Sequence, residues 1–358
     1  MNSVKIGKYE IGIGTKPFIV AEMSGNHNQS LERALKLVDA AASSGAHALK
    51  LQTYTPDTMT LRVNKPGFFV QDKNSLWSGE HLYDLYTKAQ TPWEWHKPIF
   101  DRCREKGVLC FSTPFDETAV DFLLELDVPC FKIASFENTD LPLIRRVAKT
   151  GKPLIISTGM ATLAELVETV ATAREAGASQ LILLKCTSAY PAMPSEINLK
   201  TIPHMSQLFN LPVGLSDHTM GLGVPLAAVS LGVSFIEKHF TLSRDDGGVD
   251  SAFSLNQEEL KDLVEEAEKA WLALGCPHYG QTENESKSLR FRRSIYVTKD
   301  IAAGETLTLG NVRCIRPGFG LKPKHFESIL GMKANKSIEL GTPLSWDLLD
   351  GVSPVDMQ

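Results

Sequence analysis

Residues 153–187, PLIISTGMATLAELVETVATAREAGASQLILLKCT, carry the pattern that decides the fold. Two short apolar runs, 153–157 and 181–187, flank a longer segment, 161–176, whose apolar residues have the spacing of an amphipathic helix. Gly177 is suited to end that helix before the second run begins. A strand, a helix and a second strand in this order predict one unit of a parallel sheet.

The same unit recurs along most of the chain. Eight such units within about 275 residues are typical of a (β/α)8 TIM barrel, so we predict this α/β fold. A doubly wound sheet is the alternative, but no Gly-x-Gly-x-x-Gly motif opens the first predicted helix. The predicted strands cover residues 18–23, 46–54, 108–113, 129–134, 153–157, 181–187, 213–216 and 234–240, and the predicted helices cover 30–44, 93–106, 116–126, 140–150, 161–176, 196–208, 224–231 and 257–274.

Two stretches interrupt this alternation. Residues 55–92 are too long for an ordinary connection after a strand, which predicts a lid or an insertion at the active site. From residue 286 on, short β-like segments at 294–297, 306–308, 312–315 and 337–338 alternate with glycine-containing turns. We therefore expect a barrel domain over residues 1–285 and a small β-rich domain over residues 286–358.

Composition excludes several classes of protein. The 358 residues carry a net charge of −5 and no basic run, so nucleic acid is not an expected partner. No apolar run approaches the ~20 residues of a membrane span. The amino terminus lacks the apolar core of a signal peptide, and the six cysteines form no CxxC pair. We expect a cytoplasmic enzyme with reduced thiols, in which any bound anion meets a local group of cations.

Polar residues follow all eight predicted strands, where TIM barrels place their chemistry. Lys50 and Lys132 close the second and fourth strands, and Thr113, Ser135 and Ser157 stand at neighbouring strand ends. Two ammonium groups with hydroxyls in one barrel mouth predict an anion site, for a phosphorylated or dicarboxylate-like substrate. The alternative is a lysine that extends to solvent or pairs with Glu22.

Two histidines indicate a metal site. His218 and His239 end the seventh and eighth strands, with the carboxylates of Glu237 and Asp250 nearby. Two imidazoles with open positions for water suit a divalent transition metal. The alternative is that each is an ordinary hydrogen-bonded histidine. His27, close to Glu22 in the sequence, leaves the same two interpretations open.

A Schiff-base mechanism is a further alternative. Lys132 or Lys185 would then be the nucleophile, and the activity would be indifferent to chelators. The histidine pair argues against this interpretation.

At these strand ends the sequence resembles the sialic acid synthase family, and within it most closely the bacterial pseudaminate branch. The resemblance covers essentially the whole chain. Residues 316–320 (RPGFG) resemble the antifreeze-like (SAF) domain that ends these enzymes. The barrel motifs are residues 19–28 (IVAEMSGNHN), 49–54 (LKLQTY), 111–116 (FSTPFD), 131–135 (FKIAS), 214–218 (GLSDH) and 236–240 (IEKHF).

The resemblance implies a condensation of phosphoenolpyruvate with an open-chain amino sugar and water, which yields a nonulosonic acid and phosphate. It implies a divalent metal, Mn²⁺ or alternatively Mg²⁺ or Co²⁺, held by His218 and His239. It also implies a domain-swapped homodimer in which Arg316 reaches the sugar site of the partner's barrel.

The resemblance also assigns roles to the strand-end residues. Glu22 would orient or deprotonate the attacking water, with general acid help as an alternative, and Glu237 would orient a metal ligand. Ser188 stands where related synthases often have asparagine. The residues expected to grip phosphoenolpyruvate are Lys50, Lys132, Ser135, Ser157, Ser188, Thr113 and Ser216, and those expected to contact the sugar or metal-bound water are Gln52, Tyr190 and Asp250.

Residues 77–83 (WSGEHLY) and 135–138 (SFEN) resemble the pseudaminate branch. That branch accepts 2,4-diacetamido-2,4,6-trideoxy-L-altrose. A synthase for N-acetylneuraminate or legionaminate is the alternative within the family. A carbohydrate-binding protein with an inactive barrel is the alternative outside enzymes, and the polar ends of all eight strands speak against it.

Overall fold

The computed structural model describes residues 3–73 and 75–351. The chain divides into two compact units, Met1–Gly275 and Cys276–Gln358. Residues 352–358, at the end of the expected small domain, lie outside the described residues. No helix among the described residues has the length and apolar character needed to cross a bilayer.

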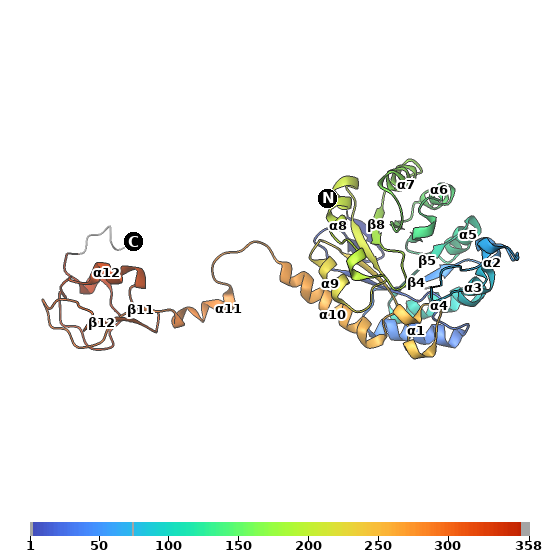
Figure 1. Ribbon diagram of the computed structural model, residues 1–358. Coiled ribbons are helices and arrows are strands. Elements are labelled where there is room, and N and C mark those ends of the chain that lie inside the picture. The colour runs from blue at the N-terminus through green and yellow to red at the C-terminus, as the bar shows by residue number, and fades with distance from the viewer. Residues whose placement is uncertain (1–2, 74, 352–358) are drawn as a thin grey trace. The chain divides into compact units, whose positions relative to one another are not determined.

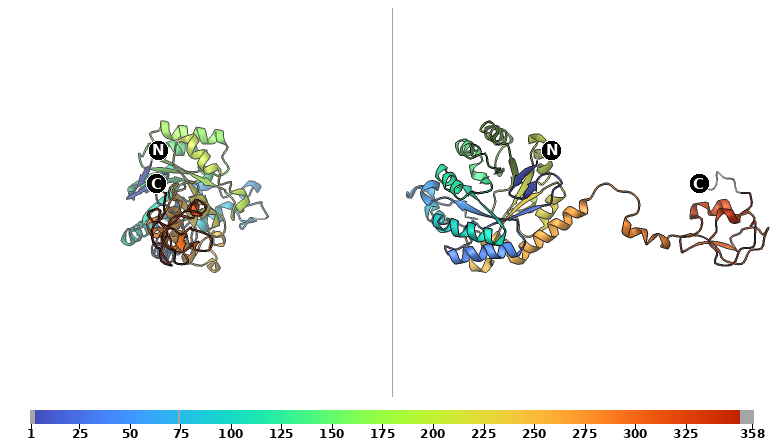
Figure 2. Two further views of the ribbon diagram at one scale, coloured as in Figure 1. Left: turned by 90° about the vertical axis from the view of Figure 1, so that its left-hand side faces the viewer. Right: turned by 180° about the vertical axis from the view of Figure 1, so that it is seen from behind.

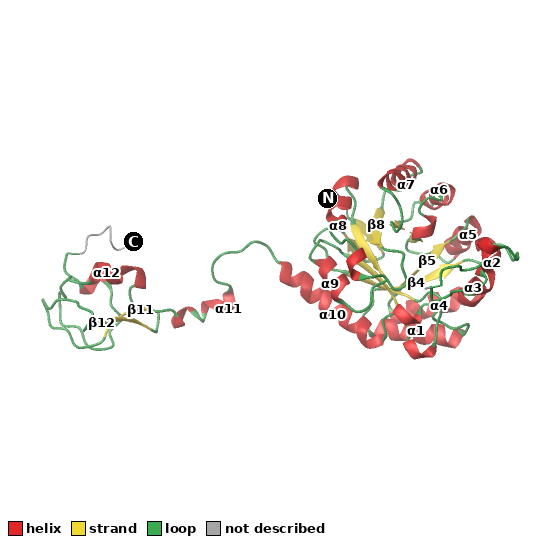
Figure 3. Cartoon of the chain, viewed as in Figure 1, coloured by secondary structure: helices red, strands yellow, loops and turns green. Residues whose placement is uncertain are grey.

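The first unit is a closed barrel of eight parallel strands, as predicted. β10 pairs with β3 and thereby closes the sheet, and a ring of helices surrounds the strands (Figure 1, Figure 3). The strands are β3 (Phe18–Glu22), β4 (Ala48–Thr53), β5 (Leu109–Pro114), β6 (Phe131–Ile133), β7 (Leu154–Ser157), β8 (Leu181–Cys186), β9 (Val213–Asp217) and β10 (Phe235–His239).

Eight helices follow the strands in sequence, and the view from behind shows them on the outside of the sheet (Figure 2). One predicted boundary was wrong. A helix was expected to start at residue 196, but Asn198 has a φ of 53° and separates η3 (Pro194–Glu196) from α8. The helices are α1 (Leu31–Ser43), α4 (Trp93–Lys106), α5 (Glu117–Glu125), α6 (Leu141–Ala148), α7 (Leu163–Glu175), α8 (Thr201–Phe209), α9 (Gly223–Val229) and α10 (Gln257–Leu274).

The strands are apolar on both faces because each face packs against a different layer. In β8, Leu181 and Leu183 belong to the core between strands and helices, whereas Ile182 and Leu184 belong to the core inside the barrel. This period of two fixes which side chains point inward. The inward positions reach the barrel mouth at the last residues of each strand.

An amino-terminal hairpin was not predicted. β1 (Val4–Ile6) and β2 (Tyr9–Ile11) pair in antiparallel fashion. Val4, Ile6 and Ile11 are buried in the inner core with Phe18 and Phe235, at the first residues of β3 and β10. The hairpin therefore covers the end of the barrel opposite the site. Its strands have three residues each, too few for a clear periodic signal.

The long insertion lies over the barrel mouth. It contains α2 (Pro56–Met59), η1 (Pro66–Phe68) and α3 (Leu82–Ala89). Trp77 Nε1 donates to the carbonyl of Val249, which lies in the loop after β10. That loop carries η4 (Arg244–Asp246) and η5 (Ser251–Phe253), and η2 (Ser135–Glu137) follows β6. These segments build the walls above the strand ends.

The second unit has a core of its own. β11 (Ser294–Val297) and β12 (Val312–Ile315) pair in antiparallel fashion, and Thr306 and Ile338 take part only in isolated bridges. Turns and short helices complete the unit around an apolar cluster that includes Ile295 and Leu344. The short helices are α11 (Glu283–Ser286), η6 (Leu289–Phe291), η7 (Pro323–His325), α12 (Phe326–Ile329) and η8 (Trp346–Leu348).

A buried ion pair links the ends of β9 and β10. Lys238 Nζ lies 2.6 Å from Asp217 Oδ2 and donates to the carbonyl of Thr219 at 2.7 Å. The side chains are 1% and 0% exposed. Although both residues stand in motifs of the predicted site, their contacts hold the barrel together.

Removing one partner should therefore unfold the barrel more easily. Lys238→Met leaves the Asp217 carboxylate buried and unpaired, and we expect the free energy of unfolding to fall by about 3–5 kcal/mol. Urea unfolding followed by circular dichroism measures this change. The matched control is Lys97→Met, which removes the exposed Lys97–Asp101 pair and should leave the midpoint almost unchanged. Equal midpoints for Lys238→Met and the wild type would contradict this role.

Candidate active site

A cavity of about 310 Å³ opens where the barrel strands end. Its walls combine inward strand-end residues with side chains of the insertion and of the loops after β6 and β10. It is lined by Ser24, Gln52, Tyr54, Met59, Val70, Trp77, Leu82, Leu85, Tyr86, Ala89, Phe115, Ala134, Phe136, Glu137, Tyr190, His239, Val249 and Asp250. Polar groups at the floor and aromatic groups at the walls suit a small polar molecule with apolar substituents.

Four buried ionisable side chains form a cluster at the mouth. Lys50 Nζ lies 2.5 Å from Glu22 Oε2 and 3.7 Å from Glu237 Oε1. Lys132 Nζ donates to both oxygens of Glu237, at 3.0 and 3.2 Å. All four side chains are at most 6% exposed. Both lysines therefore have a carboxylate partner, and the pairing of Lys50 with Glu22 is the alternative considered from the sequence.

The two carboxyl groups differ in acidity. Burial raises the pKa of Glu22 to about 7, although Lys50 acts in the opposite direction. Burial also opposes ionisation of Glu237, but Lys132 and Lys50 outweigh it and lower the pKa of Glu237 to about 2. Near neutral pH, Glu22 is thus the carboxyl of this cluster that changes charge. When Glu22 holds a proton, the two ammonium groups outnumber the remaining carboxylate.

Hydroxyl groups surround the cluster. Lys50 Nζ donates to Thr113 Oγ1 at 3.3 Å, and Ser216 Oγ donates to Glu237 Oε1 at 3.1 Å. Ser135 Oγ accepts from the backbone N–H of Gly159 at 3.2 Å. The buried Ser157 Oγ has no hydrogen-bond partner among the described residues. An unsatisfied buried hydroxyl costs free energy unless a ligand completes it, so it marks a position for a polar ligand atom.

Gly159 allows two serines to approach each other. A Cβ at this position would lie 2.7 Å from Ser135 Oγ and closer still to Ser188 Oγ. Ser135 follows β6 and Ser188 follows β8, so a glycine after β7 brings hydroxyls from both sides together. Ser188 is therefore at the mouth, as expected.

The two predicted metal ligands face each other. The ring centroids of His218 and His239 are 5.3 Å apart, and both side chains are buried. His218 Nδ1 lies 3.0 Å from the carbonyl oxygen of Thr187. A carbonyl can only accept, so this contact places a proton on Nδ1, and Nε2 is the ring nitrogen that a metal would meet.

Asp250 and Tyr190 stand beside the histidines. Asp250 Oδ2 lies 3.7 Å from His239 Nδ1, and Ser24 Oγ donates to the same carboxylate oxygen. The Tyr190 ring centroid is 4.5 Å from that of His218. Gln52 Nε2 donates to Glu22 Oε1 at 3.0 Å and joins this side of the mouth to the ionic cluster.

The histidine pair has features that fit a metal. His239 Nδ1 is buried without a hydrogen-bond partner among the described residues. Burial lowers the pKa of His239 well below its ordinary value, which favours the neutral form that binds metals. Burial acts in the same direction on His218, but Cys186 and the Thr187 carbonyl outweigh it and raise the pKa of His218. No group of three or more His, Cys, Asp or Glu side chains within residues 3–73 and 75–351 is arranged to hold a metal. The chain thus offers two imidazoles, and water or substrate would have to complete the coordination.

Other predicted residues lie in different surroundings. Glu237 contacts Lys132, Lys50 and Ser216, so its hydrogen bonds are those of a partner for lysines. Arg316 is exposed just after β12, in the second unit. His27 is buried with contacts within loops: Nδ1 accepts from the N–H of Gln29, and Nε2 lies 3.2 Å from Thr91 Oγ1. These contacts match the loop hydrogen bonding considered as one interpretation of His27.

The sequence did not single out two residues of the mouth. Glu137 lines the cavity, its Oε2 is buried without a hydrogen-bond partner among the described residues, and burial raises its pKa to about 7. Cys186 Sγ lies 4.0 Å from His218 Nδ1. Burial opposes ionisation of this thiol, but His218 and Ser135 lower its pKa to about 7. Glu137 follows a predicted strand and Cys186 lies within one, and these positions near strand ends were the signal that could have identified them.

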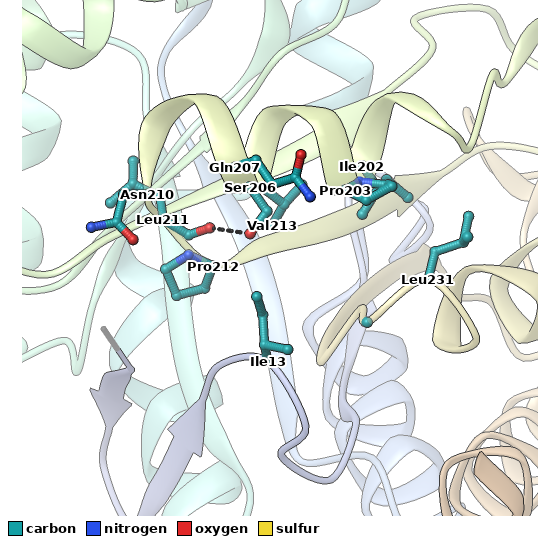
Figure 4. Close-up of a pocket in the computed structure, with 11 residues that line it drawn as sticks. Ile13, Ile202, Pro203, Ser206, Gln207, Asn210, Leu211, Pro212, Val213 and Leu231 are labelled. Atoms are coloured by element: carbon teal, nitrogen blue, oxygen red, sulfur yellow. Dashed lines mark hydrogen bonds between the residues drawn. The ribbon is translucent and has the colours of Figure 1, made fainter. Parts of the chain in front are cut away.

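A second hollow lies at the opposite end of the barrel. It has a volume of about 300 Å³, and its walls come from α8, the start of β9 and the loops around Ile13 and Leu231 (Figure 4). Ser206 Oγ donates to the carbonyl of Leu211 across its edge. None of the residues that line it is titratable, so it offers no acid–base chemistry.

Comparisons with known proteins agree with this geometry. The NeuB family model matches residues 37–279, and the SAF domain model matches residues 292–350. The pseudaminic acid synthase of Campylobacter jejuni is 46% identical over 92% of this chain and 95% of its own. The N,N'-diacetyllegionaminic acid synthase of Legionella pneumophila is 35% identical over 93% of this chain and 94% of its own. The crystal structure of an N-acetylneuraminic acid synthetase from Leptospira borgpetersenii superposes with a TM-score of 0.71 at 30% identity, covering 81% of this chain and 96% of that one.

Proposed function

Because the chain belongs to the NeuB family, we propose that it is a pseudaminic acid synthase, which condenses phosphoenolpyruvate with 2,4-diacetamido-2,4,6-trideoxy-L-altrose and water to give pseudaminic acid and phosphate. The observation that carries this proposal is the position of the Glu22, Lys50, Lys132 and Glu237 cluster beside two facing histidines in one barrel mouth. The six cysteines are all free, in keeping with a cytoplasmic location.

The cluster and its hydroxyls would hold phosphoenolpyruvate. Lys50 and Lys132 supply charge-assisted hydrogen bonds to the carboxylate and phosphate. Hydroxyl donors around the two lysines come from Thr113, Ser135, Ser157, Ser188 and Ser216. The hydroxyl of Ser157 has no hydrogen-bond partner among the described residues. Protonated Glu22 leaves the cluster with an excess of positive charge, which favours entry of an anion into a site where water screens little.

The histidine pair would hold a divalent cation, for which Mn²⁺ is the first candidate and Mg²⁺ or Co²⁺ are alternatives. Such a cation, bound by His218 and His239, would polarise the aldehyde oxygen of the open-chain sugar as a Lewis acid. Asp250, Gln52 and Tyr190 line the same side of the cavity and would orient the sugar or metal-bound water.

Glu22 would handle the proton of the attacking water. C3 of phosphoenolpyruvate forms a bond to the sugar aldehyde carbon, and the aldehyde oxygen takes up a proton and becomes a hydroxyl as its π bond breaks. Water adds at C2, where an electron deficiency develops, and Glu22 takes one proton of that water. The new C2 hydroxyl gives up its remaining proton as the bond between C2 and the bridging oxygen breaks, which leaves the ketone and inorganic phosphate. A pKa of about 7, produced by burial, is close to the ideal for a general base at neutral pH.

The aromatic wall suits a 6-deoxy sugar with acetamido groups. Trp77, Phe115 and Phe136 line the cavity above its polar floor, and they offer apolar contacts to methyl groups. Identity is 46% to a pseudaminic acid synthase and 35% to a legionaminic acid synthase, which favours the altro-configured substrate. Synthesis of legionaminate or N-acetylneuraminate is the second candidate.

Phosphate release tests the function directly. The purified protein is incubated with phosphoenolpyruvate and Mn²⁺ and, in separate reactions, with the altrose, the legionaminate precursor or N-acetylmannosamine. We expect turnover to be fastest with the altrose, and ¹⁸O in the bridging position of phosphoenolpyruvate to appear in phosphate. Faster turnover of another sugar would transfer the assignment to that product. Sugar binding without phosphate release would favour a carbohydrate-binding protein.

The pH profile tests the role of Glu22. A base must be ionised, so kcat/KM should rise with pH through about 7 and then level off. Glu22→Gln should lower kcat by about 10²–10⁴-fold and remove the rise of activity with pH. Phosphoenolpyruvate should still bind to this variant. The matched control is Glu137→Gln, because Glu137 also has a pKa of about 7. If Glu137→Gln alone removed this rise, Glu22 would not be the base.

Chelation tests the metal. Excess EDTA should abolish phosphate release, and Mn²⁺ should restore it. His218→Ala and His239→Ala should each lower activity by at least about 10²-fold and resist rescue by Mn²⁺. His278→Ala, at an exposed position of the second unit, is the control and should keep full activity. Full activity in excess chelator would remove the metal from the mechanism.

Mixing two inactive variants tests the swapped dimer. We propose that Arg316, exposed after β12, reaches the sugar site of a partner's barrel. Arg316→Ala and His218→Ala should each be inactive alone. After mixing and subunit exchange, activity should return to about one quarter of the wild type, because random pairing leaves one intact site in half of the dimers. No recovery in a sample shown by light scattering to have exchanged subunits would contradict the swap.

A further inference from the structure

A larger cavity lies outside the barrel wall, between α7 and α8. Its volume is about 830 Å³, within the range of sites for small organic molecules. Leu166 of α7, Met205 of α8 and Lys185 of β8 contribute to its lining. Figure 1 labels these three elements on the first unit. Of the site residues considered from the sequence, Lys185, the alternative Schiff-base nucleophile, lines this cavity, and it lies outside the barrel mouth.

Lys185 breaks the apolar pattern of its strand. Leu181 and Leu183, on the same face of β8, are buried against the helices. Lys185 continues that face and points its stem toward the cavity. Its Nζ donates to the carbonyl of Cys186 at 2.9 Å and to Thr187 Oγ1 at 3.3 Å. These two hydrogen bonds lower the cost of placing an ammonium group on a face that is otherwise apolar.

Two lysines line the cavity, and no carboxylate in its lining neutralises them. Lys185, Lys200 and His204 line it, and no Asp or Glu is among its lining residues. Neither lysine forms an ion pair with any described residue, unlike the lysines of the barrel mouth. Burial lowers the pKa of Lys185, although the neighbouring Cys186 thiol acts in the opposite direction.

Other parts of the lining suit the rest of an organic anion. Thr201 opens α8, a helix whose amino end has no side-chain cap, so its dipole favours negative charge there. Met160, Leu166, Leu199 and Met205 supply apolar surface.

The cavity is separate from the barrel mouth. Alternation along β8 directs Lys185 toward the helices and Cys186 toward the barrel interior, where its thiol lies near His218. Cys186 also contributes to the lining of the outer cavity, so strand β8 is the boundary that the two sites share.

We propose that this cavity is a second ligand site, which binds a small organic anion. Its phosphate or carboxylate group contacts Lys185, Lys200 and His204, and its apolar part packs on Leu166, Leu199 and Met205. This site does not depend on the proposed synthase activity, because Lys185, Lys200 and His204 do not line the cavity of the barrel mouth.

Isothermal titration calorimetry without sugar substrate tests the proposal. AMP is the phosphate probe and succinate the carboxylate probe. We expect one of them to bind with one molecule per chain. Lys185→Met and Lys200→Met should each weaken that binding at least tenfold. The loss of affinity should be largest at low salt, where charges are screened least. Binding of AMP alone would identify a phosphate site, and binding of succinate alone a carboxylate site.

Two controls locate the binding. Lys149→Met removes an exposed lysine outside the cavity, and Ser216→Ala changes the barrel mouth; neither should alter the affinity. Lys200 is exposed, so Lys200→Met keeps the test valid if Lys185→Met does not fold. The proposal would be overturned if neither probe bound. It would also be overturned if Lys200→Met bound the probe as tightly as the wild type, or if Ser216→Ala lost affinity for it.

Discussion

The closure of eight parallel strands forces alternate side chains into a space that water hardly enters, and the rest of the site depends on this constraint. Glu22 and Lys50 are register partners on β3 and β4, so their inward side chains must meet. Lys132 and Glu237 come from distant parts of the chain and meet in the same space. A charge buried there without a partner would cost several kcal/mol of stability. The carboxyl groups of Glu22 and Glu237 therefore lie in contact with the ammonium groups of Lys50 and Lys132.

This balance explains how the mouth can bind an anion in a protein with a net charge of −5. Neither lysine is a free cation, so the electrostatics depend on the proton of Glu22, whose pKa of about 7 results from burial. Buried polar atoms that lack a hydrogen-bond partner among the described residues lie around the same mouth, among them Ser157 Oγ, His239 Nδ1 and Glu137 Oε2. A bound substrate or ion therefore has polar contacts to complete.

Sequence periodicity predicted the eight strands and eight helices because buried parallel strands and amphipathic helices leave strong local signals. It missed the hairpin of Val4–Ile6 and Tyr9–Ile11, whose stability comes from packing on the end of the barrel. The rule that TIM barrels carry their chemistry at the strand ends predicted that Lys50, Lys132, His218 and His239 share one barrel mouth. It left Glu137 and Cys186 aside, because their burial and neighbours depend on how loops and strands pack.

The amino-acid sequence alone determined the barrel, the edge where polar residues gather and the family to which the chain belongs. These follow from local periodicity and from residue types that each strand end carries regardless of its neighbours. Only the tertiary structure decided which lysine meets which carboxylate, that Lys238 and Asp217 stabilise the fold, and that Lys185 faces a cavity outside the barrel. Those properties depend on burial and on distances between residues far apart in the chain, and pairwise electrostatics at a few ångströms cannot be inferred from order along the sequence.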